Sequence, residues 1–403
     1  MRILLANESA RAHRGGVNRM VVESCEWLQQ AGHTVALAYF DAGPSEVSCR
    51  TYPWPNTADA SEIAHTIDRV LSDFQPDIIQ LHHDAQPPLF PNALADHVPA
   101  CRFIHDQSWF CSSDNRMARD GTPCHRPHGL SCLFWHYAQG CGGKSPIGNG
   151  QRWLRVQHRR SLQRVRYLRI QVASQFMKKG LLENDYTEEQ IDVIPLFATR
   201  PRASAPTEPG LMLVASRLVK GKGVDFLISA LKELPALPWR LAVAGDGPER
   251  ITLEKLTEEL ELEKRINFLG ELSPPELEKW YARTSLVLSP VLRAEPFGLV
   301  GVEAMAHGKP MIAFSGGATE EWLVDGETGI VVRERCVKAW ARAMAVLLAQ
   351  PELRGRMGEQ ARIRWENYRP EVFIARLVDS FYRCIKSFES FFPNAREGPC
   401  ARG

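Results

Sequence analysis

Three cations and two glycines follow an apolar run of strand length in the second half of the chain. Residues 216–223 come directly after Leu211–Ala215 and include Arg217 and Lys222. A guanidinium and an ammonium beside flexible backbone are suited to binding a diphosphate. Basic loops also occur as solvated turns. This segment alone therefore leaves both interpretations open.

A second segment, residues 295–303, combines two carboxylates with the start of a predicted helix. Pro296 disfavours a helical conformation for Glu295, and Gly298 allows a ligand to approach the backbone. The N–H groups of a helix N-terminus favour an anion, whereas Glu295 and Glu303 suit hydroxyl groups. Taken alone, Glu303 could be an exposed helix residue. The combination predicts a ligand in which a sugar is joined to a diphosphate.

These segments resemble the retaining glycosyltransferases of family four (glycosyltransferase group 1), which adopt the two-domain GT-B fold. The spacing of Glu295 and Glu303 is similar to the paired-glutamate motif of that family, and the similarity covers roughly residues 211–332. The other matching segments are 216–218, 222–223, 245–248, 267–270, 308–310, 316–320 and 325–329.

The resemblance implies roles for individual residues. Arg217 and Lys222 would hold the donor diphosphate. Glu295 would contact hydroxyls of the transferred sugar, and Glu303 would contact the ribose. His105, at a strand end where the family often has a histidine, joins Glu295, Arg217 and Lys222 as a candidate catalytic residue. The other candidate donor-binding residues are Gly15, Gly16, Gly245, Gly247, Phe268, Leu269, Pro296, Phe297, Gly298 and Leu299.

In the first half, Arg14, Gly15 and Gly16 lie between the first predicted strand and helix. The residues alone fit a tight turn and a ligand-contacting loop equally well, and the resemblance favours a loop that faces the donor. His82 and His83 end another predicted strand and are candidates for the acceptor side.

The segment 107–150 is less regular than its surroundings and contains Cys111, Cys124, Cys132 and Cys141. Their spacing lacks the paired C-x-x-C pattern of common zinc sites. Reduced thiols in an acceptor loop are the favoured interpretation, and a metal site or redox pairing remains open.

Residues 138–145 fit a loose Walker pattern, with Ala138 in the first glycine position. A P-loop leads directly into a helix. Pro146, Gly148 and Gly150 are expected to break such a helix, so we expect no ATP site here.

Residues 121–182 contain no Asp or Glu and many Arg and Lys. Such a block attracts anions. One interpretation is an ordinary helix, expected over residues 151–167, with a basic outer face. The other is a surface that binds an anionic membrane or a phosphate-bearing acceptor.

Short apolar runs alternate with longer amphipathic segments almost throughout, which predicts parallel sheets covered by helices. The fold class is therefore α/β, with two Rossmann-like domains whose sheets face across a cleft. We expect an N-terminal acceptor-side domain (1–197), a donor-binding domain (198–370) after a Pro-containing linker, and a C-terminal helix (371–395) that packs back on the first domain. The predicted strands are 2–6, 34–39, 77–81, 101–105, 169–173, 192–195, 211–215, 240–244, 266–269, 286–288, 310–313 and 330–332.

The 403 residues carry a formal net charge of +2, which does not indicate any class of binding partner. We expect that the protein does not bind nucleic acid. No signal peptide or membrane-spanning segment is predicted, so the expected location is the cytoplasm, including the inner membrane face as a peripheral protein. Because the chain has no Asp-x-Asp triplet, we expect no metal or cofactor requirement.

The sequence thus predicts retaining, hexosyl-type transfer from a nucleotide-diphosphate sugar to a glycan or lipid-linked acceptor, as in polysaccharide biosynthesis. Two further functions remain open: a non-catalytic nucleotide-sugar-binding protein, and a phosphorylase or epimerase with the same fold.

Overall fold

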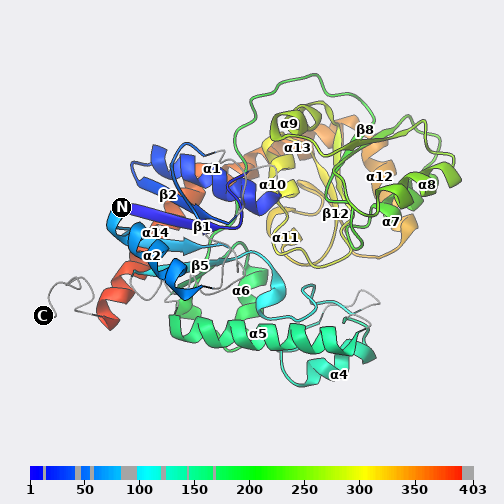
Figure 1. The fold of residues 1–403 in the computed structure, drawn as a ribbon. Coiled ribbons are helices and arrows are strands. Elements are labelled where there is room, and N and C mark those ends of the chain that lie inside the picture. The colour runs from blue at the N-terminus through cyan, green and yellow to red at the C-terminus, as the bar shows by residue number, and fades with distance from the viewer. Residues whose placement is uncertain are drawn as a thin grey trace, which may run out of the picture. The chain divides into compact units, whose positions relative to one another are not determined.

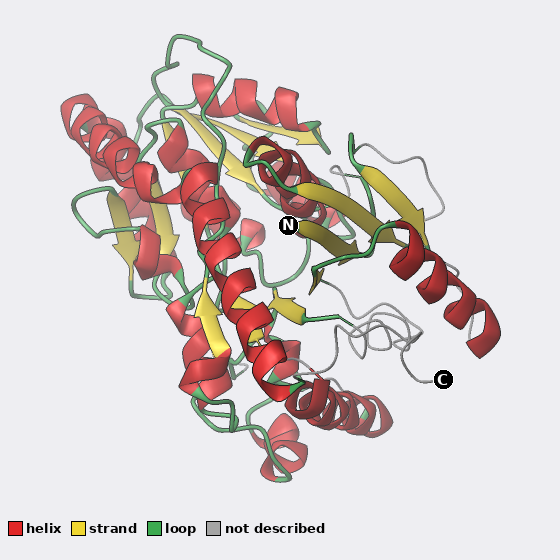
Figure 2. Ribbon diagram, turned by 90° about the vertical axis from the view of Figure 1, so that its left-hand side faces the viewer, coloured by secondary structure: helices red, strands yellow, loops and turns green. Residues whose placement is uncertain are grey.

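The computed structural model describes residues 1–11, 15–40, 47–54, 59–82, 98–118, 124–142, 145–166 and 169–392. The chain divides into two compact units. The N-terminal unit contains Met1–Asp114, Arg126–Leu196 and Pro370–Gly403, and the C-terminal unit contains Asn115–His125 and Phe197–Arg369. Within each unit, strands run through the middle and helices surround them (Figures 1 and 2).

In the described part of the N-terminal unit, seven parallel strands form one sheet, in the order β3-β2-β1-β4-β5-β6-β7. The central strands β4 and β5 are buried along their whole length, as apolar runs covered on both faces should be. The strands are β1 (Arg2–Asn7), β2 (Thr34–Tyr39), β3 (Arg50–Pro53), β4 (Ile78–Leu81), β5 (Ala100–Ile104), β6 (Arg169–Val172) and β7 (Ile191–Val193).

Helices from both ends of the chain cover this sheet. The last one packs against β5 and β6, where Ser380 donates a hydrogen bond to Asp192 (2.6 Å) and accepts one from Gln171 (2.9 Å). The helices are α1 (Gly16–Gln30), α2 (Ala60–Asp73), α4 (Ser131–Ala138), α5 (Pro146–Arg166), α6 (Gln175–Leu182) and α14 (Pro370–Phe391), with short 3₁₀ turns η2 (Gln107–Trp109) and η3 (Glu188–Gln190).

The described C-terminal unit contains a second parallel sheet, in the order β10-β9-β8-β11-β12-β13. Its core gathers large side chains such as Trp340, Phe314 and Met344 between the sheet and its helices. The strands are β8 (Leu211–Ala215), β9 (Arg240–Ala244), β10 (Ile266–Gly270), β11 (Leu286–Ser289), β12 (Met311–Phe314) and β13 (Gly329–Val332). The helices are α7 (Val224–Lys232), α8 (Arg250–Glu259), α9 (Pro274–Arg283), α10 (Leu299–Ala306), α11 (Thr319–Trp322), α12 (Val337–Ala349) and α13 (Pro351–Trp365), followed by the 3₁₀ turn η4 (Glu366–Tyr368).

The predicted α/β class with two Rossmann-like domains is confirmed, and every strand predicted from the sequence is present. Strand β3 was not predicted, because Arg50–Pro53 is a short edge strand without an apolar run. A capping box starts α9, in which the Glu276 carboxylate accepts from the Ser273 backbone N–H at 2.9 Å.

The prediction that Pro146, Gly148 and Gly150 would break a helix is wrong, because α5 begins at Pro146 and continues through both glycines. Proline is compatible with the first turn of a helix, and the Gly148 N–H donates to Ser145 Oγ at 3.2 Å. The Walker-like segment still lacks the context of a P-loop, because it follows helix α4 and not a strand. Lys144 lies outside the described residues.

Candidate active site

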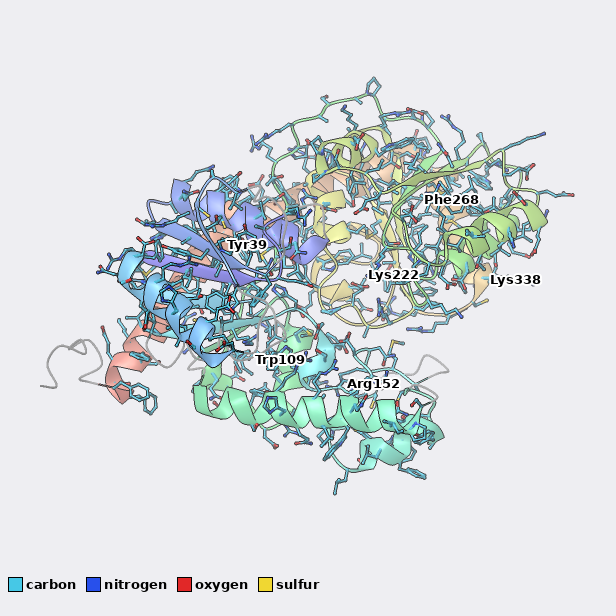
Figure 3. The ribbon with its side chains drawn as sticks, in the orientation of Figure 1. Tyr39, Trp109, Arg152, Lys222, Phe268 and Lys338 are labelled. Carbon is cyan, nitrogen blue, oxygen red and sulfur yellow. The ribbon has the colours of Figure 1, made fainter. Side chains whose placement is uncertain are left out.

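The candidate donor-binding residues gather at one edge of the C-terminal sheet. Apart from Gly15 and Gly16, which belong to the N-terminal unit, they lie in β10, in the loops that follow β8, β9 and β11, and in α10. Because these strands are parallel, their carboxyl ends share an edge, where ligands of such sheets bind. Figure 3 marks Lys222, from the loop after β8, and Phe268, from β10. Phe268 and Leu269 are both partly exposed.

Lys222 and Glu295 form an ion pair across two of these loops. Lys222 Nζ donates to Glu295 Oε1 at 2.5 Å, and the two side chains are 20% and 18% exposed. The next residue, Gly223, has a φ of 71°, and a Cβ there would lie 2.0 Å from the Pro290 carbonyl oxygen. The loop after β8 is thus packed tightly on the loop after β11. Arg217 is exposed at the start of the first loop.

Close packing between two loops explains the glycines of the loop after β9. A Cβ on Gly245 would lie 2.0 Å from the Ser216 carbonyl oxygen, and one on Gly247 would lie 2.3 Å from that of Leu218. The Leu218 N–H also donates to the Asp246 carbonyl at 2.9 Å. Gly245 and Gly247 therefore let the second loop pack on the first, while their contact with a donor stays a prediction.

The backbone of Glu295 is fixed by a glycine turn after β12. The Ala318 N–H donates to the Glu295 carbonyl at 2.9 Å. Gly317 has a φ of 62°, and a Cβ there would lie 2.3 Å from the same oxygen. Only glycine allows this approach, so the Gly316–Gly317 pair positions the catalytic candidate.

A buried tryptophan supports the entry into α10. Trp322 Nε1 donates to the Phe297 carbonyl at 2.7 Å. A Cβ on Gly301 would lie 2.5 Å from the Trp322 ring. Gly298 begins the helix with a φ of 96°, and the partly exposed Pro296 and Leu299 flank this turn. The α10 N-terminus is therefore held rigidly at the sheet edge. Trp322 could not be predicted as a support of this turn, because the residues around it in the sequence do not distinguish it from any other core tryptophan.

Glu303 is oriented by a residue that the sequence analysis also missed. The Tyr281 hydroxyl, from α9, donates to Glu303 Oε2 at 2.9 Å. Tyr281 is buried and stacks on His307, with ring centroids 5.3 Å apart. Tyr281 lies in an ordinary amphipathic helix, so nothing in the local sequence predicts its contact with Glu303.

Lys309, from one of the segments that carry the family resemblance, has a structural role. Its Nζ donates to Thr207 Oγ1 and to the Ala282 carbonyl oxygen, both at 2.9 Å. Burial lowers the pKa of Lys309 to about 8, because desolvation disfavours the charged form.

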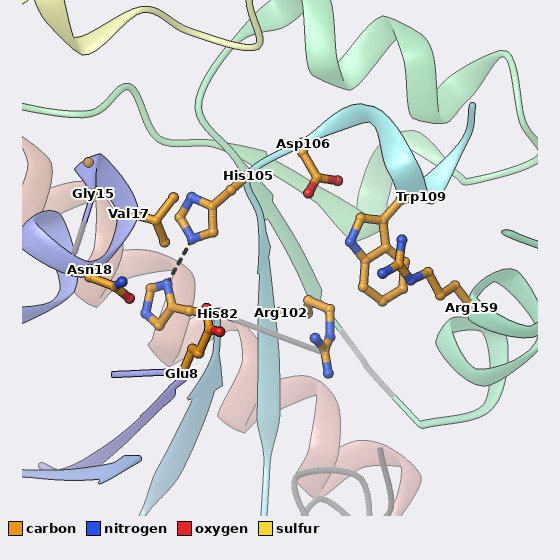
Figure 4. A pocket seen from close by; sticks show the side chains of 11 residues that line it. Glu8, Gly15, Val17, Asn18, His82, Arg102, His105, Asp106, Trp109 and Arg159 are labelled. Carbon is orange, nitrogen blue, oxygen red and sulfur yellow. Dashed lines mark hydrogen bonds between the residues drawn. The ribbon is translucent and has the colours of Figure 1, made fainter. Parts of the chain in front are cut away.

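The N-terminal unit has its own pocket, of about 240 Å³ (Figure 4). It lies where the loops after β1, β4 and β5 meet the first turn of α1 and one side of α5. Gly15 caps α1 with a φ of 120° and has open space around it. The open space beside Gly15 therefore allows this tight turn to contact a ligand as well. The lining includes Gly15, Gly16, His82, Arg102, His105, Trp109 and Arg159.

Two histidines meet at the base of this pocket. His82 Nδ1 and His105 Nε2 are 3.0 Å apart and share a hydrogen bond, shown dashed in Figure 4. Both rings stack with Phe103, at centroid distances of 5.8 and 4.7 Å. The structure thus brings His105 together with His82, while Arg14 and His83 lie outside the described residues.

Two arginines meet at an aromatic ring on another side of the pocket. The guanidinium carbons of Arg102 and Arg159 lie 5.1 and 5.2 Å from the Trp109 ring centroid (Figure 4). Arg102 comes from β5 and is buried, and Arg159 comes from α5. The same lining also contains the carboxylates of Glu8 and Asp106, so the pocket presents both cations and anions to a ligand. The sequence analysis noted Arg159 only as part of the basic block and did not single out Arg102 or Trp109.

The four cysteines of segment 107–150 remain thiols. Among the described residues, no three His, Cys, Asp or Glu side chains come close enough together to hold a metal ion. Cys111, Cys124, Cys132 and Cys141 are all partly exposed. The structure thus does not assemble them into a metal site.

Two family models match successive parts of the chain. Glycosyltransferase Family 4 matches residues 14–198, and Glycosyl transferases group 1 matches residues 198–364. The solved structures are similar in fold. Sucrose-phosphate synthase from Thermosynechococcus elongatus has a TM-score of 0.72 and 18% identity, covering 96% of this chain and 99% of that one. Anabaena HepE in complex with UDP and glucose has the same TM-score and identity, with 95% and 99% covered.

Curated relatives match over shorter stretches. D-inositol 3-phosphate glycosyltransferase from Pseudarthrobacter chlorophenolicus is 32% identical over 199 residues, 47% of each chain. Alpha-D-kanosaminyltransferase from Streptomyces kanamyceticus is 35% identical over 153 residues, 38% of this chain and 39% of that protein. The chain thus spans about half or less of the length of these relatives. Since the two family models together span residues 14–364, the chain belongs to glycosyltransferase family four, with the GT-B fold.

Proposed function

We propose that this protein transfers a sugar from a nucleotide-diphosphate sugar to an acceptor, with retention of the anomeric configuration. The observation that supports this most directly is the Lys222–Glu295 ion pair. It places a cation for a diphosphate and a carboxylate for sugar hydroxyls side by side, at a sheet edge that also carries the N-terminus of α10.

In this proposal, cations and a helix N-terminus stabilise the leaving group. As the bond from the anomeric carbon to phosphate breaks, negative charge grows on the diphosphate. Arg217, Lys222 and the N–H groups at Gly298 and Leu299 would stabilise that charge without reorganisation. Glu303, oriented by Tyr281, would accept hydrogen bonds from the ribose hydroxyls, and Phe268 and Leu269 would contact the base.

Retention follows if the acceptor hydroxyl attacks the same face that the diphosphate leaves. The acceptor oxygen then forms a bond to the anomeric carbon, and its proton passes to the leaving phosphate oxygen. Glu295 and His105 would orient and polarise the sugar rather than bond to it. This route requires no metal, in keeping with the absence of an Asp-x-Asp triplet in the sequence.

The acceptor is assigned to the pocket of the N-terminal unit. Of the residues that line it, Arg102 and Arg159 suit a phosphate or another anionic group of the acceptor, and Glu8 and Asp106 suit its hydroxyl groups. The relatives named D-inositol 3-phosphate glycosyltransferase support an anionic acceptor. A glycan or a lipid-linked sugar bearing phosphate would satisfy this pocket.

A donor screen tests the proposal. Binding and slow hydrolysis of nucleotide sugars are measured by calorimetry and nucleotide release, and products with candidate acceptors are assigned by the coupling of the anomeric proton. One nucleotide sugar should bind, hydrolyse slowly and give a retained glycoside. No binding to any nucleotide sugar would refute the proposal. Binding without turnover of any acceptor would favour a non-catalytic sensor. A sugar phosphate as product would favour a phosphorylase, and an epimerised donor would favour an epimerase.

A further inference from the structure

Helix α4 carries an apolar stripe that faces solvent. Leu133, Phe134 and Tyr137 lie three, four and seven residues after Leu130, which is the spacing of one helix face. Leu130 is 74% exposed and Phe134 is 65% exposed, and Leu133 and Tyr137 are exposed as well. An amphipathic helix of a globular protein normally buries such a stripe in its core. This exposed stripe therefore marks an interaction site.

Helix α5, which packs against α4 (Figure 1), extends the apolar surface. Ile147 is 75% exposed and Leu154, two turns further along the same face, is 61% exposed. The two helices in contact thus expose six large apolar side chains, more than the scattered single residues of ordinary surfaces.

The structure reduces the basic block of residues 121–182 to a smaller set of available cations. Arg160 pairs with Asp185, and Lys178 pairs with Glu188. Arg169 pairs with Asp192. These acids lie outside the acid-free block, so three of its cations are paired locally.

Three of the remaining cations are close in sequence to the apolar patch. Arg126 stacks over Trp135 of α4, with its guanidinium carbon 3.7 Å from the ring centroid. Arg155 is exposed beside Leu154, and Arg152, marked in Figure 3, is partly exposed one turn earlier. Apolar side chains with arginines around them, and no acid within residues 121–182, are typical of surfaces that insert into the interface of an anionic bilayer.

We propose that the patch formed by Leu130, Leu133, Phe134, Tyr137, Ile147 and Leu154 inserts into the headgroup region of an anionic lipid bilayer, while Arg126, Arg152 and Arg155 contact lipid phosphates. A second copy of the chain fits this surface poorly, because a symmetric contact would place the arginines against their own copies. No described helix is long and apolar enough to cross a membrane, so the contact is peripheral. This inference goes beyond sugar transfer and does not depend on it.

Sedimentation with vesicles tests the proposal. Vesicles of phosphatidylcholine alone and of equal parts phosphatidylcholine and phosphatidylglycerol are compared at low and high salt. The full chain should bind the mixed vesicles, and binding should weaken with salt as surface charges are screened. The double change Phe134→Ser and Ile147→Ser should lower the partition coefficient at least about tenfold, because each side chain loses its apolar transfer energy. Arg155→Glu should weaken binding to mixed vesicles only.

A matched control removes an equally exposed apolar side chain elsewhere. Ile251→Ser, at a residue that is 68% exposed in the C-terminal unit, should leave vesicle binding unchanged. Circular dichroism and urea unfolding confirm that the variants fold. Donor hydrolysis in the absence of lipid should be equal in all of them, so failure of the membrane proposal is distinguishable from failure of the proposed transfer.

Three outcomes would overturn the proposal. One is binding to neither vesicle, and another is undiminished binding of the double variant. The third is a concentration-dependent dimer that Phe134→Ser dissociates, without vesicle binding, which would assign the patch to contact between copies.

Discussion

The Lys222 ammonium lies 2.5 Å from the Glu295 carboxylate, so each charged group has the other as its partner. The contact holds Lys222, a flexible side chain, in one orientation. In the proposed donor site, a diphosphate would therefore meet a cation that is already in place, which stabilises developing charge at a low reorganisation cost.

Replacing Lys222 by alanine should remove this stabilisation. We expect kcat/KM with the identified donor to fall about 100- to 1,000-fold, or roughly 3–4 kcal/mol, the scale for one preorganised electrostatic contact. Lys220→Ala, at an exposed residue of the same loop, should stay within about twofold of the unmodified enzyme. Equal, small effects of the two changes would mean that the diphosphate binds elsewhere.

Tyr281→Phe tests the orientation of Glu303. The change removes the 2.9 Å hydrogen bond to the carboxylate and keeps the aromatic ring that stacks on His307. Since one such bond contributes roughly 1 kcal/mol, KM for the donor should rise about three- to tenfold with little change in kcat. Tyr382→Phe, at an exposed tyrosine of α14, serves as the control. A loss confined to kcat would instead place Glu303 at the reacting centre.

Transfer should survive an excess of chelator. The proposed leaving-group contacts come from Arg217, Lys222 and the start of α10, and none of them is a metal ligand. Initial rates are compared with and without EDTA after dialysis. Loss of activity that magnesium or manganese restores would contradict metal-independent transfer, and rescue by zinc alone would implicate the cysteines of segment 107–150.

Lys309 should make stability depend on pH in the alkaline range. Burial lowers the pKa of Lys309 from 10.5 to about 8. Between these values the unfolded chain holds a proton that the folded chain has released, so this group makes the free energy of unfolding rise with pH. In Lys309→Met that contribution is absent.

Urea unfolding at neutral pH and at about pH 10 measures this effect. The stability of the original protein relative to Lys309→Met should increase from the first pH to the second. Lys338→Met, at an exposed lysine marked in Figure 3, should show no such trend. A difference between Lys309→Met and the original protein that stays constant with pH would mean that Lys309 remains charged in the folded state.

The sequence by itself determined the two parallel sheets and the loops that carry the donor-site candidates. Both depend on local patterns: apolar runs of strand length, glycines where the backbone must turn, and charged residues directly after a strand. Because parallel strands place their carboxyl ends at one edge, the gathering of Arg217, Gly245, Phe268 and Glu295 followed from the order of elements alone.

Only the tertiary structure showed which side chains from other elements contact the donor-site loops and hold them in place. The contacts of Tyr281 with Glu303 and of Trp322 with Phe297 join residues more than twenty positions apart. Neither aromatic residue differs in local pattern from a core residue, so only the packing of α9 and α11 against the loops could reveal them. The meeting of Arg102 and Arg159 at Trp109 likewise depends on where α5 packs.

The same reason explains the apolar stripe of α4. Periodicity shows that Leu130, Phe134 and Tyr137 share one helix face, but it cannot show whether that face meets a core or solvent. Another side of α4 carries His136, which is buried and shares a hydrogen bond of 2.7 Å with Ser112. Local sequence therefore defined the stripe, and the placement of one helix on another left it exposed, because a helix can bury only the face that its neighbour covers.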